Sequence, residues 1–306
     1  AREADGVPYY LAELAHRALV DSPGEVATDL AGQSGLDALL LQRIAHLPDP
    51  ARALLEALAV AARPLLGTIA AQVAELGASA QSLLVLLRNH RLVRIRRSPK
   101  GDVLEPFHDR VREAVAGALS IDETVQLHRR LADAHEIAGG DAEAIETHLE
   151  GAGEVARAFP WAVQAAEKSA AALAFERAAA WYERALALGV ASDERQRELT
   201  LARGQALAHA GCGLEAARAY ELAAAMSTGP EAVRLRITAA DQLARCGYVD
   251  ESKCMLEGIL AAMGEKPRSF DLGGVLRLVR ERVLVRLRGF DYEARDEAQV
   301  PPETIL

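Results

Sequence analysis

The sequence predicts an all-α fold, in which a helical domain with one small β-hairpin is followed by a solenoid of stacked helix pairs. Half of the 306 residues are hydrophobic, Ala and Leu dominate, and aromatic residues make up 4% of the chain. This composition favours helices. One short segment instead alternates apolar and basic residues, as a strand does. Beyond that segment, small residues recur about every three dozen positions, which indicates repeated helix pairs.

The first helices are predicted from apolar residues that recur at helical spacing. Pro48 and Pro50 interrupt this spacing, so that one helix ends before them and the next begins after them. The predicted helices are 36–47, 51–62, 66–76 and 80–89, with a further one starting near Asp109.

A hairpin is predicted between the last two of these helices. Residues 93–96 alternate apolar and Arg side chains, 98–102 (SPKGD) form a turn, and 103–107 form the return strand. Several helices followed by a hairpin are the order of a winged-helix domain, in which the hairpin is the wing.

From about residue 122 the chain repeats one pattern. The pattern starts at a small residue. A large residue follows four positions later, and a small or apolar residue follows three positions after that. Another small residue lies twelve positions before the start. Successive patterns are 34, 38 and 36 residues apart, which is similar to tetratricopeptide repeats. Small side chains there let two helices approach closely, and the aromatic residue fills the space toward the next pair.

The alternative is a helical bundle in which frequent Ala residues match by chance. The matching residues are Ala132 with Ala144, His148 and Gly151; Ala166 with Ala178, Tyr182 and Ala185; Gly204 with Ala216, Tyr220 and Ala223; and Ala240 with Ser252, Leu256 and Ile259.

Charge is distributed unevenly along the chain. The net charge of −9 argues against nucleic-acid binding by bulk electrostatics, yet residues 88–112 carry eight bases against three acids. A winged helix places one helix in the major groove of DNA. We expect 66–76 at that position, and it has no Lys or Arg and one acid, Glu75. We therefore expect the basic wing to meet an acidic protein surface rather than DNA, with a DNA-binding transcription regulator fragment as the alternative.

Cysteine usage and the absence of targeting signals indicate a cytoplasmic protein. Cys212, Cys246 and Cys254 are odd in number and lack metal-site spacing, so we expect reduced thiols that pack as small buried hydrophobes. No apolar run has the length of a membrane span and no secretory signal is present, so no membrane partner is expected. Both ends, Ala1 and Pro301-Pro302, look like cuts through a longer polypeptide.

No residues combine into a catalytic or metal site. The chain has no Gly-Lys pair of a phosphate-binding loop, no kinase catalytic motif, and no zinc-protease or serine-hydrolase signature. His128 and His135 are seven residues apart on one predicted helix, which is typical of packing or surface residues. We expect no enzyme activity, no metal and no cofactor in this segment.

Two short motifs resemble a known class of ATPase. Residues 6–14 (GVPYYLAEL) resemble the G-x-P segment that ends the ATPase module of signal-transduction ATPases with numerous domains, the STAND class. Residues 107–113 (FHDRVRE) follow the wing, where that class has Met-His-Asp, and Phe107 here replaces the Met. Residues 148–154 and 288–292 are similar to segments of large bacterial serine/threonine protein kinases that carry a fused ATPase module.

This resemblance implies a nucleotide-dependent switch in a longer parent protein that binds ATP and ADP. By resemblance, Pro8 would pack on the adenine and His108 would reach the β-phosphate, while Asp109 would cap the helix that follows. The alternative is that Pro8 and the His-Asp pair only begin helices. Without a phosphate-binding loop, we expect no measurable nucleotide affinity in this segment.

The basic and apolar residues 275–288 have two interpretations. They form either one more solenoid helix, which we favour, or a helix that lies on a membrane surface.

Three regions are thus expected: residues 1–34 as the end of an ATPase lid region and linker, 35–120 as the winged helix, and 121–306 as the solenoid. The predicted function is non-catalytic. A protein or peptide would bind in the solenoid groove, and the winged helix would couple this event to the upstream ATPase domain.

Overall fold

The computed structural model describes residues 33–77, 80–264 and 272–288, which form fourteen helices and one three-stranded sheet. The predicted fold class is confirmed, because the helices form sequential packed pairs and the sheet lies near the N-terminal end. The chain divides into two compact units, residues 1–161 and 162–306.

The helices and strands of the winged-helix part follow the predicted order, with one added strand. They are α2 (Gln33–Ala45), α3 (Asp49–Ala61), β1 (Leu65–Leu66), α4 (Gly67–Val73), α5 (Ala80–Asn89), β2 (Val93–Ser98), β3 (Gly101–Pro106) and α6 (Asp109–Ala118).

The sheet is antiparallel with strand order β1-β3-β2. The sequence predicted only the hairpin of β2 and β3. The third strand is two residues long, with Leu65 opposite Leu104 and Leu66 opposite Val103. Two residues are too few to show an alternating pattern, so β1 could not be distinguished from the start of the following helix.

The hairpin has the predicted faces. Val93 is buried and Arg94 and Arg96 are exposed. At the turn Gly101 has a φ of 119°, a conformation that other residues rarely adopt. The wing is therefore anchored to the core by one face of β2 and presents Arg side chains on the other.

One hydrophobic core joins the helices to the sheet. Its largest fully buried side chains include Leu54 and Leu58 of α3, Leu87 of α5, Leu92, and Leu104 of β3. At about 1.5–3 kcal/mol for each buried side chain of this size, these residues account for much of the stability of the domain.

The helix at the DNA-recognition position differs from the one that we expected. Residues 66–76 contain the short α4, and Glu75 has a φ of 51°, which ends helical geometry before α5 begins. The second helix of a helix-turn-helix is the recognition helix, and α5 is the one that directly precedes the wing. The absence of Lys and Arg from 66–76 therefore does not bear on DNA binding, because α5 holds the recognition position.

The remaining helices form the repeats. The first helices of four successive pairs are each 17 residues long, as expected of one repeated unit. The helices are α7 (Ile121–Ile137), α8 (Ala142–Gly151), α9 (Val155–Ala171), α10 (Phe175–Ala187), α11 (Asp193–His209), α12 (Gly213–Ala225), α13 (Gly229–Arg245), α14 (Val249–Ala262) and α15 (Leu272–Arg288).

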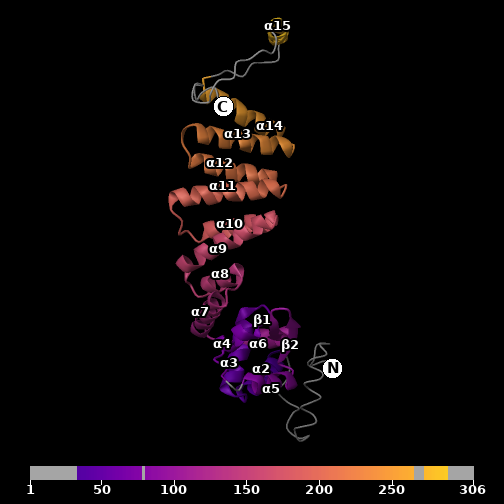
Figure 1. The fold of residues 1–306 in the computed structure, drawn as a ribbon, viewed down its shortest axis with the longest axis vertical. Coiled ribbons are helices and arrows are strands. Elements are labelled where there is room, and N and C mark those ends of the chain that lie inside the picture. The colour runs from indigo at the N-terminus through magenta and orange to yellow at the C-terminus, as the bar shows by residue number, and fades with distance from the viewer. Residues whose placement is uncertain (1–32, 78–79, 265–271, 289–306) are drawn as a thin grey trace. The chain divides into compact units, whose positions relative to one another are not determined.

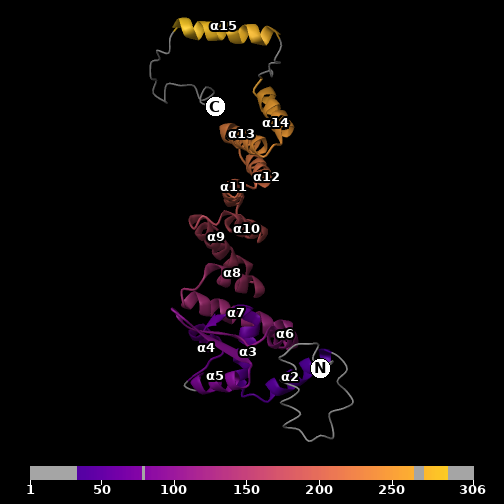
Figure 2. The same ribbon diagram turned by 90° about the vertical axis from the view of Figure 1, so that its right-hand side faces the viewer.

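From α10 to α14 each helix packs against the next one in the sequence, as Figures 1 and 2 both show. A second core lies between α12 and α13, where Ala216, Ala223 and Tyr220 meet Leu235 and Ala239. Each pair buries its apolar face only against its neighbours, which is the packing of a solenoid.

The cysteines and the helix at 275–288 compare differently with their predictions. Cys246 and Cys254 are exposed and Cys212 is half-buried, so the prediction of buried thiols is wrong for two of them. The helix predicted at 275–288 is present as α15, and its apolar side chains, such as Leu276 and Leu287, are exposed.

Candidate functional site

His108 occupies the N-cap position of α6. Its Nδ1 accepts a hydrogen bond of 3.2 Å from the backbone N–H of Arg110. An accepting Nδ1 carries no proton, so the neutral ring holds its proton on Nε2, a group that can donate to a phosphate oxygen. The ring is half-buried at the positive end of a helix, where the helix dipole favours an anion.

Asp109 is the first residue of α6, one position after the cap. Its side chain is 86% exposed, and its Oδ1 lies 3.9 Å from Nε of Arg112. The side-chain cap is therefore made by His108 and not by Asp109, because the imidazole reaches the second N–H of the helix. Asp109 still places negative charge in the first turn, where it is favourable. Pro8 lies outside the described residues.

Helix α7 belongs to both the winged-helix core and the first repeat. Leu127, Leu131 and Ala134 are buried in the same core as residues of α3, α5 and β3. The same helix packs closely against α8, and Ala132 is fully buried. A Ser120–Glu123 capping box fixes where α7 begins. A movement of the first repeat would therefore act directly on the winged-helix core.

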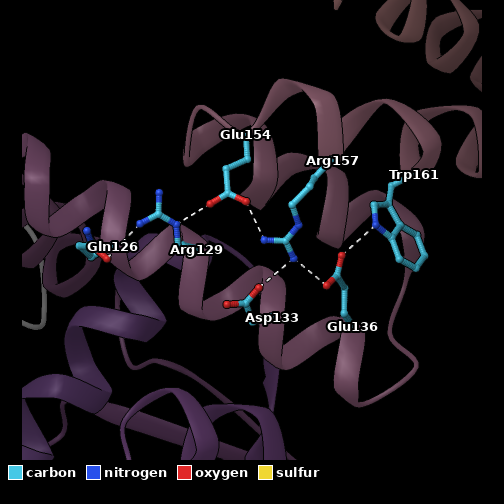
Figure 3. A network of polar contacts seen from close by, with 7 residues as sticks. All are labelled: Gln126, Arg129, Asp133, Glu136, Glu154, Arg157 and Trp161. Carbon is cyan, nitrogen blue, oxygen red and sulfur yellow. Dashed lines mark hydrogen bonds and ion pairs between the residues drawn. The ribbon is translucent and has the colours of Figure 1, made fainter. Parts of the chain in front are cut away.

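A network of charged side chains ties α7 to the start of α9 (Figure 3). The guanidinium of Arg157 donates to Asp133 at 2.9 Å, to Glu136 at 2.7 Å and to Glu154 at 2.6 Å. These hydrogen bonds, that to Asp133 first, raise the pKa of Arg157. Because three carboxylates bind one guanidinium, the Arg157 side chain is held in one position, which a single surface ion pair would not achieve.

The network extends in both directions from this centre (Figure 3). Arg129 of α7 donates to the other oxygen of Glu154, and its hydrogen bond is the main reason that the pKa of Glu154 is lowered. At the far end Nε1 of Trp161 donates to Glu136 at 3.0 Å. The network holds the first helix of the first pair to the first helix of the second.

Three histidines, His128 and His135 of α7 and His148 of α8, form a histidine cluster between these two helices. Nδ1 of His128 lies 3.0 Å from Nδ1 of His148, so one ring donates and the other accepts. The rings of His135 and His148 have centroids 5.8 Å apart. Nδ1 of His135 is buried and has no hydrogen-bond partner among the described residues.

Burial lowers the pKa of each histidine in this cluster. His148 is 4% exposed, and burial lowers its pKa from 6.5 to about 3, assisted by the charges that His128, His135 and Arg63 would carry nearby. Burial also lowers the pKa values of His128 and His135, the latter against the opposing effect of Asp141. His148 takes the large position of the first repeat, where Tyr182 and Tyr220 stand in later repeats.

The small and large residues of the repeat pattern lie mostly inside the structure. Gly204 shows why small size matters: a Cβ built on it would lie 3.3 Å from Cβ of Ala219 and from Cε1 of Tyr220. Gly151 and Leu256 are exposed. The buried members are Ala132, Ala144, His148, Ala166, Ala178, Tyr182, Ala185, Gly204, Ala216, Tyr220, Ala223, Ala240, Ser252 and Ile259.

Sequence reasoning missed both the charged network and the histidine cluster. His128 and His148 come from different helices of one pair, and their contact depends on the register between α7 and α8. The interpretation of His128 and His135 as packing residues agrees with their half-buried positions. A signal was present in His148, which replaces an aromatic residue of the repeat pattern and thereby faces the preceding helix.

The part of the chain that the structure describes contains no group of three or more His, Cys, Asp or Glu side chains arranged to hold a metal ion. None of its helices has the length and apolar character needed to cross a membrane.

These features define a class of protein: a winged-helix domain joined to tetratricopeptide-like helix pairs. No family model and no curated protein matches the chain. Among solved structures, it is similar to the Signal Transduction ATPase with Numerous Domains (STAND) protein with a tetratricopeptide repeat sensor from Pyrococcus horikoshii. The two chains share 14% identity at a TM-score of 0.29, and the match covers 95% of this chain. It covers 53% of the archaeal chain, so this chain spans about half the length of that protein.

Proposed function

We propose that the chain is the non-catalytic regulatory and protein-interaction part of a STAND-class ATPase that acts in the bacterial cytoplasm. The observation that carries this proposal is the position of α7, which is shared by the winged-helix core and the first helix pair. In this account a protein or peptide binds in the solenoid groove. Helix α7 passes the resulting change to the winged helix, and the winged helix acts on the nucleotide of the ATPase core.

Three further features support a regulatory role. The network around Arg157 ties α7 to the start of α9, so we expect a displacement of that segment to reach α7. By the resemblance of residues 107–113, His108 would contact the β-phosphate of ADP. Helix-pair repeats offer extended surfaces to peptides and proteins. The parent protein would supply the ATP and ADP site and, from the resemblance at residues 148–154 and 288–292, a serine/threonine protein kinase domain.

Substituting His108 tests the proposed nucleotide contact in the complete protein that includes the upstream module. His108→Asn keeps a side-chain cap, because Asn is a preferred N-cap residue, but it lacks Nε2–H. We expect ADP release to become about tenfold to a hundredfold faster, as the loss of a hydrogen bond to a charged group, worth about 1.5–3 kcal/mol, implies. Release of a fluorescent ADP analogue measured by stopped flow gives the rate.

Two controls separate contact from capping. His108→Ala loses both the cap and the donor, so it should release ADP as fast as His108→Asn and also lose about 1 kcal/mol of stability. His46→Ala removes an exposed imidazole elsewhere and should change neither property. Wild-type ADP release in His108→Asn would show that His108 is only a cap.

A further inference from the structure

Helix α5 stands where a winged helix places its recognition helix. The chain order α3-β1-α4-α5-β2-β3 makes α5 the second helix of the helix-turn-helix, directly before the wing. The second helix of such a motif enters the major groove. Helix α5 packs against β2, the first strand of the wing.

The exposed face of α5 has the side chains that read DNA bases. Leu83 and Leu87 are buried and hold the helix on the core. The opposite face has no acidic residue. Arg pairs with guanine, Asn and Gln pair with adenine, Ser bonds to several bases, and apolar groups contact the thymine methyl group. The exposed residues of α5 are Gln81, Ser82, Val85, Arg88 and Asn89.

The wing continues this surface with cations. Arg97 and Lys100 are exposed near the turn and have no ion-pair partner among the described residues. Arg94 and Arg96 share one acid, Glu105, which neutralises half of their charge. Across α5, β2 and β3, residues 80–106 carry six Arg or Lys against two acids. A surface of this charge attracts phosphate groups within about one Debye length, roughly 10 Å.

Arg91 lies between α5 and the wing, and its exposed side chain adds one more cation to this surface. It has a φ of 54°, the left-handed conformation that ends many helices and is usually taken by Gly. A non-glycine residue in this region costs on the order of 1 kcal/mol. The hydrogen bond from the Leu92 N–H to the Leu87 carbonyl, at 2.9 Å, and the burial of Leu92 offset this cost.

We propose that the α5–wing surface, made of the exposed face of α5 with Arg91, Arg97 and Lys100, binds duplex DNA. Helix α5 enters the major groove, and the wing cations contact the phosphates alongside it. An acidic protein surface would use mainly the same cations, whereas the amide side chains of Gln81 and Asn89 also suit the edges of bases. The net charge of −9 of the whole chain weakens this binding through longer-range repulsion.

Fluorescence anisotropy of a labelled duplex of about 25 base pairs with mixed sequence tests the proposal, with the full chain in about 50 mM salt. We expect micromolar binding. The double variant Arg97→Glu/Lys100→Glu should bind at least tenfold more weakly, and its slope of log affinity against log salt should be shallower by about 2. Arg236→Glu reverses an exposed charge on α13 and is the matched control, with little effect expected.

A second variant tests the groove contact separately. Gln81→Ala/Asn89→Ala alters only exposed side chains of α5, so the fold should be kept, and we expect threefold to tenfold weaker binding at an unchanged salt slope. The proposal is overturned if the chain does not bind the duplex at about 50 µM protein, or if the wing reversal leaves binding unchanged. It is also overturned if polyglutamate competes as well as duplex DNA, which would identify an acidic protein as the partner.

Discussion

Acidification from pH 7 to pH 5 is expected to remove about 2 kcal/mol from the free energy of unfolding through His148 alone. In the unfolded chain this histidine takes up a proton below pH 6.5, whereas the folded one stays neutral until about pH 3. The unfolded state therefore binds more protons throughout this interval, and stability falls as the pH falls. Above pH 6.5 the contribution is fully present.

Urea unfolding followed by circular dichroism at pH 7, 6 and 5 measures this loss, since most carboxylates stay ionised over that range. His148→Phe places an aromatic residue where later repeats have Tyr182 and Tyr220, and it removes the titrating group. We expect this variant to lose much less stability between pH 7 and 5 than the wild type. His46→Ala, an exposed control, should keep the wild-type dependence. An unchanged dependence in His148→Phe would contradict the assignment.

Replacement of Gly204 by Leu is expected to destabilise the protein by about 2 kcal/mol or more. Helix propensity favours Leu over Gly by about 1 kcal/mol, but a Cβ at this position already lies 3.3 Å from Ala219 and Tyr220, and three further carbons have no space. Gly204→Ala should fall within about 1 kcal/mol of the wild type, because the same propensity gain offsets a smaller crowding.

Gly258→Leu is the matched control, because Gly258 is also helical and a Cβ built on it would have nothing within 4 Å. Here only the helix propensity changes, so this variant should be about 1 kcal/mol more stable than the wild type. Thermal and urea unfolding of both variants measure the two effects. Equal effects at Gly204 and Gly258 would mean that close helix approach at Gly204 does not stabilise the repeats.

The sequence was most informative where a pattern repeats. Strand alternation at residues 93–96 located the wing to within a residue or two, because one face of β2 is buried and the other solvated. The recurring small residues located four helix pairs, since close approach of two helices tolerates only small side chains at Ala132, Ala166, Gly204 and Ala240.

Features set by short segments or by register could not be predicted. The two-residue strand β1 is not visible as a pattern, and α2 precedes the three helices of the winged-helix core. The sequence prediction therefore placed residues 66–76, and not α5, at the recognition position. The sequence placed the cap of α6 at Asp109, because Asp is the more common capping residue. In the structure the preceding residue, His108, is the cap, because its ring nitrogen reaches the backbone N–H of Arg110.

The charged network and the histidine cluster depend on contacts between helices. Arg157 reaches carboxylates 21 and 24 residues away, and these distances in sequence carry no pattern of their own. The proposed nucleotide contact of His108 and the proposed DNA contact of α5 use different elements of the winged-helix domain, so each can be tested without the other.

The central claim is that α7 couples the repeats to the winged-helix core, and hydrogen–deuterium exchange of Leu149→Ala tests it most directly. Leu149 of α8 is fully buried, and its truncation should destabilise the first pair by about 2–5 kcal/mol. The account predicts faster exchange in α8 and α7 and also in α3 and α4, whereas Leu243→Ala in α13 should leave α3 and α4 unchanged. Faster exchange confined to α8 and α7, with α3 and α4 as in the wild type, would contradict the coupling.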